Sequence, residues 1–271
     1  MIETRDKTRI HFRDCGAGRA IVFVAPWGLC SDWWDIPVIS LPERGGWRCV
    51  SFDRRGHGRS DDPCCGYDFD TLADDIAAVL DGLDLQNAAP VGHSLGGAEV
   101  VRYLTRHRSH RVSRAVLIAP TTPFNLRTDD NPGGKPRENL EKIYESLKHD
   151  LPRLAAQAAP DFFGVPKNPV STETMDWWCR MLLDRCSIKV LSDLFKVMNE
   201  TDFRAELRTI RTPTLILSGD IDKSAPLESH GRPTHELIPD SRLLVYENAA
   251  HGLPYTHTDR MLADIVAFAA A

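Results

Sequence analysis

Hallmarks of several protein classes are missing from this chain of 271 residues. No apolar run approaches the roughly 18 residues that a transmembrane helix needs. The first seven residues carry four charged side chains and lack the apolar segment of a secretory signal. Basic residues are not in surplus, because the formal net charge is −5. We therefore expect no membrane association and no nucleic-acid partner, since nucleic-acid binding leaves a basic patch.

The chain also lacks the usual patterns of cofactor and metal sites. Seven cysteines occur at irregular spacing, and the adjacent pair Cys64 and Cys65 fits neither a redox motif nor a zinc site. An odd number of cysteines at irregular spacing, without a secretory leader sequence, is typical of proteins in a reducing compartment. We therefore expect a cytoplasmic protein. Residues 53–60 lack the glycine and lysine signatures of nucleotide loops, and we interpret them as a structural turn with ion pairs. We expect no metal and no organic cofactor.

What the chain does contain is an alternation of buried strands and amphipathic helices. Residues 20–25 form a continuous apolar run, typical of a strand covered on both faces. Residues 70–83 place apolar side chains at helical spacing. Further strands are predicted at 8–12, 48–52, 88–91, 113–119, 212–217 and 242–246, and further helices at 95–107, 227–238 and 259–269. This alternation predicts an α/β fold with a mostly parallel central sheet and helices on both faces.

The alternation is interrupted in the middle of the chain. Prolines and glycines cluster between residues 123 and 136, and no convincing strand follows before residue 200. Helices are predicted at 137–151, 152–163, 171–184 and 187–199. We therefore expect an α/β core made of residues 1–121 and 202–271, with residues 122–201 inserted as a helical cap.

A candidate nucleophile stands at the end of one predicted strand. Gly92-His93-Ser94-Leu95-Gly96 fits G-x-S-x-G, follows an apolar strand and opens a helix, which is the context this motif requires. The neighbours of Ser94 must be small because the serine sits on a sharp turn. The alternative is a serine in an ordinary glycine-rich turn.

Candidates for an acid, a base and an oxyanion hole also follow strands. Asp220 and Asp222 end one strand, and the carboxylate of either can accept a hydrogen bond from an imidazole N–H. Asp222 is favoured because it lies further into the loop. His251 follows the last strand among small residues. The oxyanion donors are predicted to be the backbone N–H groups of Leu95 and Trp27. The order serine, aspartate, histidine matches α/β-hydrolases rather than chymotrypsin or subtilisin.

These motifs resemble those of bacterial α/β-hydrolases of the esterase and cofactor-free (non-haem) haloperoxidase group. The matching stretches are residues 51–60, 91–97 and 217–222. In that family the triad acid is the fourth residue of a G-x-x-D stretch, which implies Asp222. The family commonly has His-Gly before the oxyanion donor, where this chain has Ala25-Pro26. Peracid-forming members often carry proline after the donor, where this chain has Gly28, so the resemblance implies hydrolysis more than perhydrolysis.

Together these features predict a serine hydrolase that cleaves small-molecule carboxylic esters or lactones through an acyl-enzyme, with Ser94, Asp222 and His251 as the triad. An aryl or alkyl ester and an acylated lactone are the expected substrates. An apolar pocket is predicted from Leu29, Phe124, Phe162, Trp178 and Met181. The alternatives on the same triad are a perhydrolase or haloperoxidase and a lactam or carbon–carbon bond hydrolase. A small-molecule receptor with a retained triad is the alternative of another class, and the oligomeric state stays open.

Overall fold

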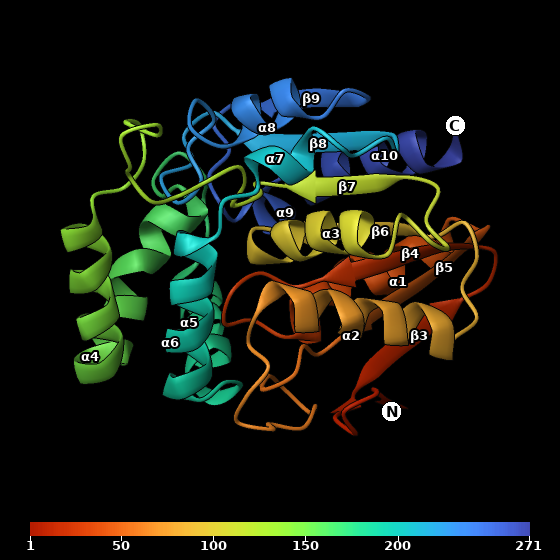
Figure 1. The fold of residues 1–271 in the computed structure, drawn as a ribbon, viewed down its shortest axis with the longest axis horizontal. Helices are drawn as coiled ribbons and strands as arrows, with labels where there is room; N and C mark the ends of the chain where they lie inside the picture. Colours follow the sequence, from red (N-terminus) through yellow and green to blue (C-terminus); the bar gives the residue numbers. More distant parts are fainter.

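The computed structural model describes residues 1–271 and is built around one seven-stranded sheet (Figure 1). Its order is β3-β5-β4-β6-β7-β8-β9, and every neighbouring pair is parallel except β3 with β5. The strands are β3 (Phe12–Gly16), β4 (Arg19–Val24), β5 (Trp47–Phe52), β6 (Ala89–His93), β7 (Ala115–Ile118), β8 (Thr214–Gly219) and β9 (Ser241–Tyr246). The predicted α/β fold with a mostly parallel sheet is therefore confirmed.

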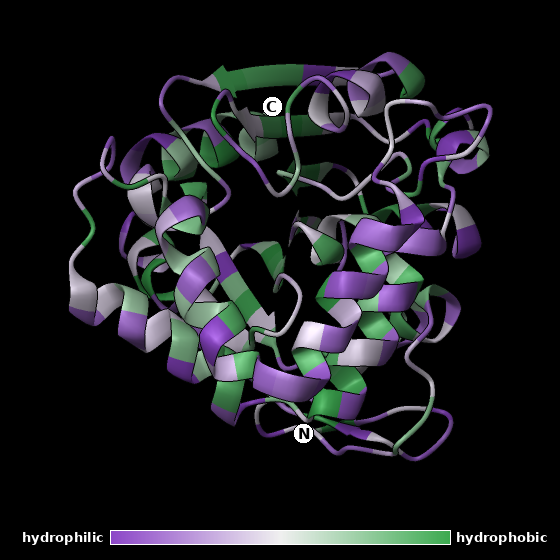
Figure 2. Cartoon of the chain, turned by 90° about the vertical axis from the view of Figure 1, so that its left-hand side faces the viewer, coloured by the Kyte–Doolittle hydropathy of each residue, from purple (hydrophilic) through white to green (hydrophobic).

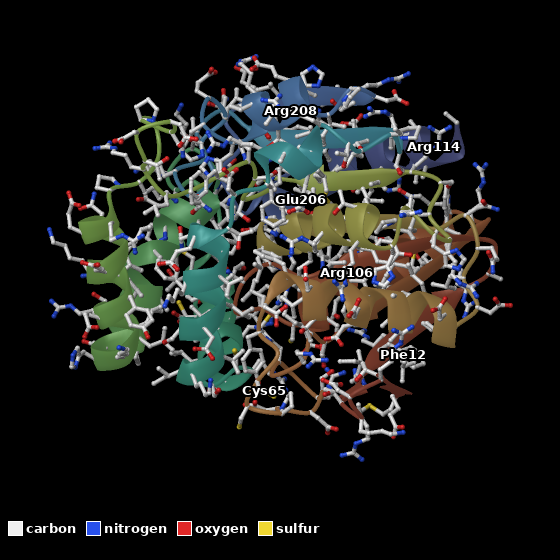
Figure 3. The ribbon with its side chains drawn as sticks, in the orientation of Figure 1. Phe12, Cys65, Arg106, Arg114, Glu206 and Arg208 are labelled. Atoms are coloured by element: carbon white, nitrogen blue, oxygen red, sulfur yellow. The ribbon has the colours of Figure 1, made fainter.

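Helices cover both faces of this sheet because its strands are apolar on both sides. Along β4, Ile21 and Phe23 pack with α1 (Asp35–Glu43) and α10 (Thr258–Ala270), whereas Val22 and Val24 pack with α2 (Phe69–Gly82) and α3 (Leu95–Arg106). The remaining short elements are β1 (Ile2–Glu3), β2 (Arg9–Ile10), the 3₁₀ helix η1 (Ser31–Trp34), α7 (Arg204–Leu207), α8 (Gly231–Leu237) and α9 (Leu253–Thr256). Outward-facing charges pair across these helices, as Arg102 does with Glu206 at 2.9 Å (Figure 3 labels Glu206).

Three longer helices lie beyond one end of the sheet, between β7 and β8 in the sequence: α4 (Arg137–Phe163), α5 (Thr172–Asp184) and α6 (Ile188–Glu200) (Figure 1, green to cyan). Figure 2 views the molecule from this side and shows hydrophilic and hydrophobic residues alternating along these helices. Most of their buried apolar residues join the hydrophobic cluster on the α1 and α10 face of the sheet, whereas Val190 and Leu194 of α6 belong to the cluster on the α2 and α3 face. The division of the chain at 122 and 201 stays a prediction.

The structure differs from the expected elements in several places. The strand predicted at 8–12 is two strands, β2 and β3, which pair with different partners. The helices predicted at 137–151 and 152–163 are one element with non-helical angles at Asp150. The Asp150 carboxylate accepts from the Arg153 N–H at 3.1 Å, so it caps the second half. Helices α1, α7 and α9 were not predicted; α7 and α9 are only one turn long, and α1 contains Pro37 and Pro42.

Candidate active site

The candidate nucleophile occupies the turn between β6 and α3. Ser94 has φ 56° and ψ −118°, a region that non-glycine residues rarely adopt and that costs about 1–3 kcal/mol. The Ser94 backbone is held on both sides, because its N–H donates to the Ile118 carbonyl at 2.9 Å and its carbonyl accepts from Gly97 at 2.9 Å. A Cβ on Gly96 would lie 2.5 Å from the Val24 carbonyl oxygen, so this position must stay small. The first turn of α3, directly after Ser94, is therefore packed against the end of β4.

The two other candidate triad residues are hydrogen-bonded to each other. The Nδ1 atom of His251 lies 2.7 Å from Oδ2 of Asp222, and both side chains are buried. The other oxygen of Asp222 accepts from the Ser224 N–H at 2.7 Å and the Ala225 N–H at 2.9 Å. Burial works to raise the pKa of Asp222, but the charge and hydrogen bond of His251 and these two amides outweigh it and lower that pKa. Asp220, the other candidate, is exposed.

The imidazole of His251 is fixed in orientation by its surroundings. An ionised Asp222 accepts a hydrogen from Nδ1, which leaves Nε2 of His251 as the basic nitrogen. The Phe162 ring stands edge-on to the imidazole, with 5.5 Å between centroids. His93, the residue before Ser94, contacts the His251 carbonyl through Nε2 at 3.0 Å. The turn that carries Ser94 and the loop that carries His251 are therefore joined directly.

The predicted oxyanion loop after β4 is held by a buried arginine. Arg54 donates to the Ala25 carbonyl at 2.6 Å and the Pro26 carbonyl at 3.3 Å, and it pairs with Glu99 of α3 at 2.6 Å. Burial of Glu99 raises its pKa to about 7, although Arg54 acts in the opposite direction. The ion pair predicted within residues 53–60 thus extends to the loop that carries Trp27. The backbone N–H groups of Trp27 and Leu95 donate no hydrogen bond within the protein.

The conformation of this loop does not accommodate the proline that peracid-forming members often carry at the position of Gly28. Gly28 has φ +72°, whereas the proline ring fixes φ near −65°. A proline at this position would therefore need a different loop. The indole Nε1 of Trp27 donates to the Leu191 carbonyl of α6 at 2.9 Å, so the loop is also tied to the cap helices.

Ser94 and His251 line one cavity, of about 400 Å³, between the sheet and the cap helices. Trp27, Phe162 and Trp178 line it as well. Three of the predicted pocket residues do not: Leu29 is packed in the core, Phe124 lies under the Arg204 guanidinium, and Met181 faces a separate depression near Arg185. An apolar residue near the site looks the same in the sequence whether it fills the core or lines a cavity.

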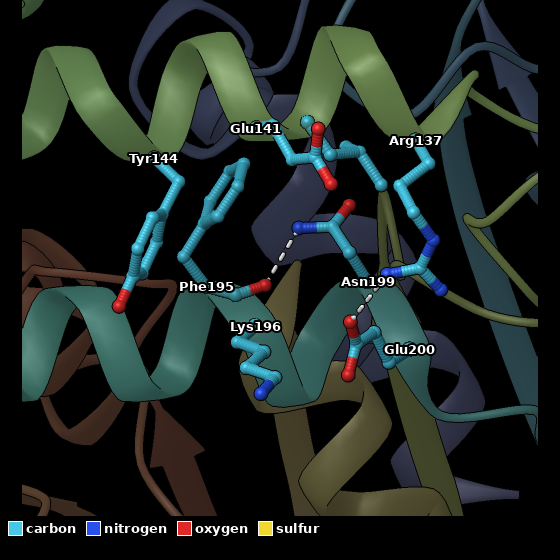
Figure 4. Close-up of a pocket in the computed structure, with 8 residues that line it drawn as sticks. Arg137, Glu141, Tyr144, Phe195, Lys196, Asn199 and Glu200 are labelled. Atoms are coloured by element: carbon cyan, nitrogen blue, oxygen red, sulfur yellow. Dashed lines mark hydrogen bonds and ion pairs between the residues drawn. The ribbon is translucent and has the colours of Figure 1, made fainter.

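Several lining residues were not predicted. Some are apolar side chains of α4 and α6, and the polar ones include Asn125, Lys135, Asn199, Lys223 and Ser224. Lys223 and Ser224 directly follow Asp222, which could have signalled their place. A shallower depression between α4 and α6 shares Leu140, Phe195 and Asn199 with the cavity (Figure 4), so the two hollows meet at these side chains. No motif marks such residues, because their placement depends on how α4 and α6 pack.

No metal centre or membrane span adds to this site. The structure contains no group of three or more histidine, cysteine, aspartate or glutamate side chains arranged to hold a metal ion. None of its helices combines the length and the apolar character needed to cross a bilayer. All seven cysteines are free thiols. The polar side chains that line the cavity are those of Ser94, Thr121, Asn125, Lys135, Asn199, Lys223, Ser224 and His251.

Known proteins match this architecture over nearly the whole chain. The family model for the α/β hydrolase fold matches residues 19–258. A non-haem haloperoxidase of Rhodococcus erythropolis is 36% identical over 99% of this chain and 98% of its own. A bifunctional esterase/perhydrolase of Acinetobacter calcoaceticus is 35% identical, with 98% of both chains covered. The solved structure of an esterase from Exiguobacterium antarcticum superposes with a TM-score of 0.94 at 28% identity, covering 100% of this chain and 98% of that one.

The fold and the matched region together define an α/β hydrolase, and this chain belongs to that family. Within it, the similarity over full length places the chain in the group of non-haem haloperoxidases and related esterases, as the sequence motifs predict. Hydrolase activity is supported by the esterases in this group.

Proposed function

We propose that this chain is a serine hydrolase that cleaves carboxylic esters or lactones through an acyl-enzyme. The observation that carries the proposal is the 2.7 Å contact of His251 with the buried Asp222, in the wall of the cavity that Ser94 also lines. A histidine held in this way by a carboxylate can take the proton of a serine hydroxyl. The structural similarity to an esterase supports the same conclusion.

The reaction follows from these roles in two halves. His251 removes the proton of Ser94 as the oxygen attacks the ester carbonyl, and the Trp27 and Leu95 N–H groups bind the resulting oxyanion. His251 then gives its proton to the departing alcohol, which leaves the acyl group on Ser94. Water attacks that acyl group with His251 again as base. The acid is released, and Ser94 recovers its hydrogen.

Hydrolysis of p-nitrophenyl esters of increasing acyl length, measured beside acyl lactones, tests this proposal. Ser94→Ala is expected to lower kcat by roughly 10³-fold or more, because the serine and histidine of a triad act as a unit. Ser146→Ala is the matched control, since Ser146 is exposed on α4 and contacts only its own helix. Substantial activity in Ser94→Ala would contradict the proposed nucleophile. A slow single turnover with a retained adduct would favour a receptor.

Perhydrolysis is a second candidate, because the Acinetobacter relative is named both esterase and perhydrolase. It differs only in the last step, where hydrogen peroxide attacks the acyl group on Ser94 and a peracid leaves. Measuring peracid formed from acetate ester and peroxide, against acid formed by hydrolysis, separates the two. We expect hydrolysis to dominate, because this chain has Gly28 where peracid-forming members of the group often carry proline.

A further inference from the structure

The cavity beside Ser94 has an unusual balance of charge for this chain. The protein as a whole carries a net charge of −5, yet the cavity is lined by two lysines and no carboxylate. Lys223 is already paired, because its Nζ lies 2.7 Å from Asp161. Lys135 has no carboxylate within 4.0 Å. A low-dielectric cavity that contains an uncompensated cation attracts anions.

The position of Lys135 is well defined. Its backbone N–H donates to the Asn125 carbonyl at 2.7 Å, just before α4 begins. Its Nζ donates to the Ser224 carbonyl at 2.9 Å. Ser224 is also the residue whose N–H donates to Asp222. The ammonium group is therefore held next to the loop that carries the proposed triad acid, with two of its three hydrogens left for a ligand.

The surroundings of Lys135 make a bound anion favourable. Burial lowers the pKa of this half-buried lysine, while the charge of Asp222 raises it. A desolvated cation is costly unless an anion or a set of hydrogen bonds compensates it. Asp222 makes no ion pair with Lys135, because no carboxylate lies within 4.0 Å of the Lys135 Nζ. Its oxygens accept instead from His251 and the amides of Ser224 and Ala225. A substrate group remains the available source of negative charge.

We propose that Lys135 binds a carboxylate of the substrate, so that the preferred ester or lactone carries a free carboxylate in addition to the bond that is cleaved. The inference rests on the proposed ester hydrolysis at Ser94 and adds a specificity-determining residue to it. The half-ester of a short dicarboxylic acid is the simplest such substrate. Water adds across its ester bond, the alcohol leaves with one proton, and the new carboxyl group loses its proton to solvent.

Matched pairs of substrates separate this charge effect from the chemistry of the cleaved bond. The monomethyl and dimethyl esters of each acid from malonic to adipic share the reacting group and differ in one charge. In the wild-type protein we expect kcat/KM for the best monomethyl ester to exceed that of its dimethyl ester by about tenfold or more, the range of one charge-assisted hydrogen bond. Free glutarate is expected to inhibit p-nitrophenyl acetate hydrolysis competitively, whereas 1,5-pentanediol is not.

Variants at the two lysines assign the effect. Lys135→Met keeps the aliphatic stem and the backbone hydrogen bond but removes the charge, and is expected to lower kcat/KM for the monomethyl ester roughly 10- to 100-fold. The ratio of kcat/KM for the monomethyl ester to that for the dimethyl ester should fall by a similar factor, and Lys135→Arg should restore much of the preference. Lys223→Met is the matched control and is expected to have the smaller effect, because Asp161 already neutralises Lys223.

The outcomes separate the two proposals. An unchanged ratio of monomethyl to dimethyl turnover in Lys135→Met, or a wild-type protein that prefers the dimethyl ester and ignores glutarate, overturns the role of Lys135 while ester hydrolysis stands. Absence of Ser94-dependent turnover for every ester, charged or neutral, overturns the proposed function itself. Glutarate inhibition is measured on the wild-type protein, so the test does not depend on the stability of a variant.

Discussion

The loops at the ends of the strands and the cap helices above them are built by different means. The loops and the strands and helices that they join contain buried charged and titratable side chains that pair with one another or with backbone groups, among them Arg54, Glu99, Asp222 and His93. In residues 122–201 no charged side chain is fully buried, and the interior is mostly apolar. Polar networks need particular partners, whereas apolar surfaces tolerate exchange of similar volume. The loops thus fix the orientation of the reactive groups, whereas substitutions in the cap helices can change the size and shape of the substrate that the cavity binds.

Low pH should act most strongly on the part of the molecule outside the cap helices, because the buried histidines His57, His93 and His230 all lie there. Burial, with the charges of Arg54 and Lys135 respectively, lowers the pKa of His57 and of His230 to about 3, and burial lowers that of His93 well below its usual value. The unfolded chain takes up protons near pH 6.5, which the folded chain does not. Stability should therefore fall as pH drops below about 6.5, by about 1.4 kcal/mol per pH unit for each histidine.

One substitution isolates a single histidine. The Nδ1 atom of His57 contacts the Arg55 carbonyl at 3.1 Å, and its Nε2 is buried without a partner. His57→Asn keeps a donor toward that carbonyl and removes the titration. Between about pH 5 and about pH 7, the free energy of unfolding in urea should have an average slope smaller by about 1 kcal/mol per pH unit than in the wild-type protein, because the unfolded histidine is only partly protonated near pH 7. Glu99, whose pKa burial raises to about 7, acts with opposite sign but equally in both chains.

The matched control for this change is His149→Asn, since His149 is an exposed side chain of α4. It should leave the slope as it is in the wild-type protein. Equal slopes in His57→Asn and the wild type would mean that His57 titrates alike in the folded and unfolded chains.

The same difference explains how far the sequence alone could predict this molecule. Ser94, Asp222 and His251 could be singled out because each follows a strand, and strand ends meet at one edge of a parallel sheet. No sequence motif could predict that Arg54 holds the oxyanion loop, because this role depends on its side chain reaching the loop after β4. Lys135 and Asn199 reach the cavity only through the packing of α4 and α6. Leu29, Phe124 and Met181 are apolar in either location, so composition could not separate lining from core.

Arg54 and Arg55 offer a sharper test of how the loops work. Both are buried and paired, but Arg54 also holds the Ala25 and Pro26 carbonyls, whereas Arg55 pairs with Asp6 and Asp75 away from the cavity. Arg54→Lys keeps a positive charge for Glu99 but removes the fork that reaches the two carbonyls. We expect kcat to fall roughly 10- to 100-fold with little change in KM, because a displaced oxyanion donor acts on the transition state.

Arg55→Lys makes the same chemical change where no catalytic loop is attached. It should lower the unfolding temperature while leaving kcat per folded molecule within about threefold of wild type. If both variants lose activity in proportion to their stability alone, Arg54 is structural and does not position the Trp27 amide.

The smallest effect is expected from the cap, where a change of volume should alter substrate preference and little else. Ala158 is exposed on α4 and lines the cavity, and Ala156 is exposed on the same helix outside it. Ala158→Phe should narrow the cavity and lower kcat/KM for a p-nitrophenyl octanoate about five- to tenfold, the range of one or two buried methylene groups. The acetate ester, which needs less room, should be cleaved as by the wild-type protein. Ala156→Phe should leave both esters unaffected, and a similar loss in the two variants would show that the helix, rather than the cavity, responds to the added ring.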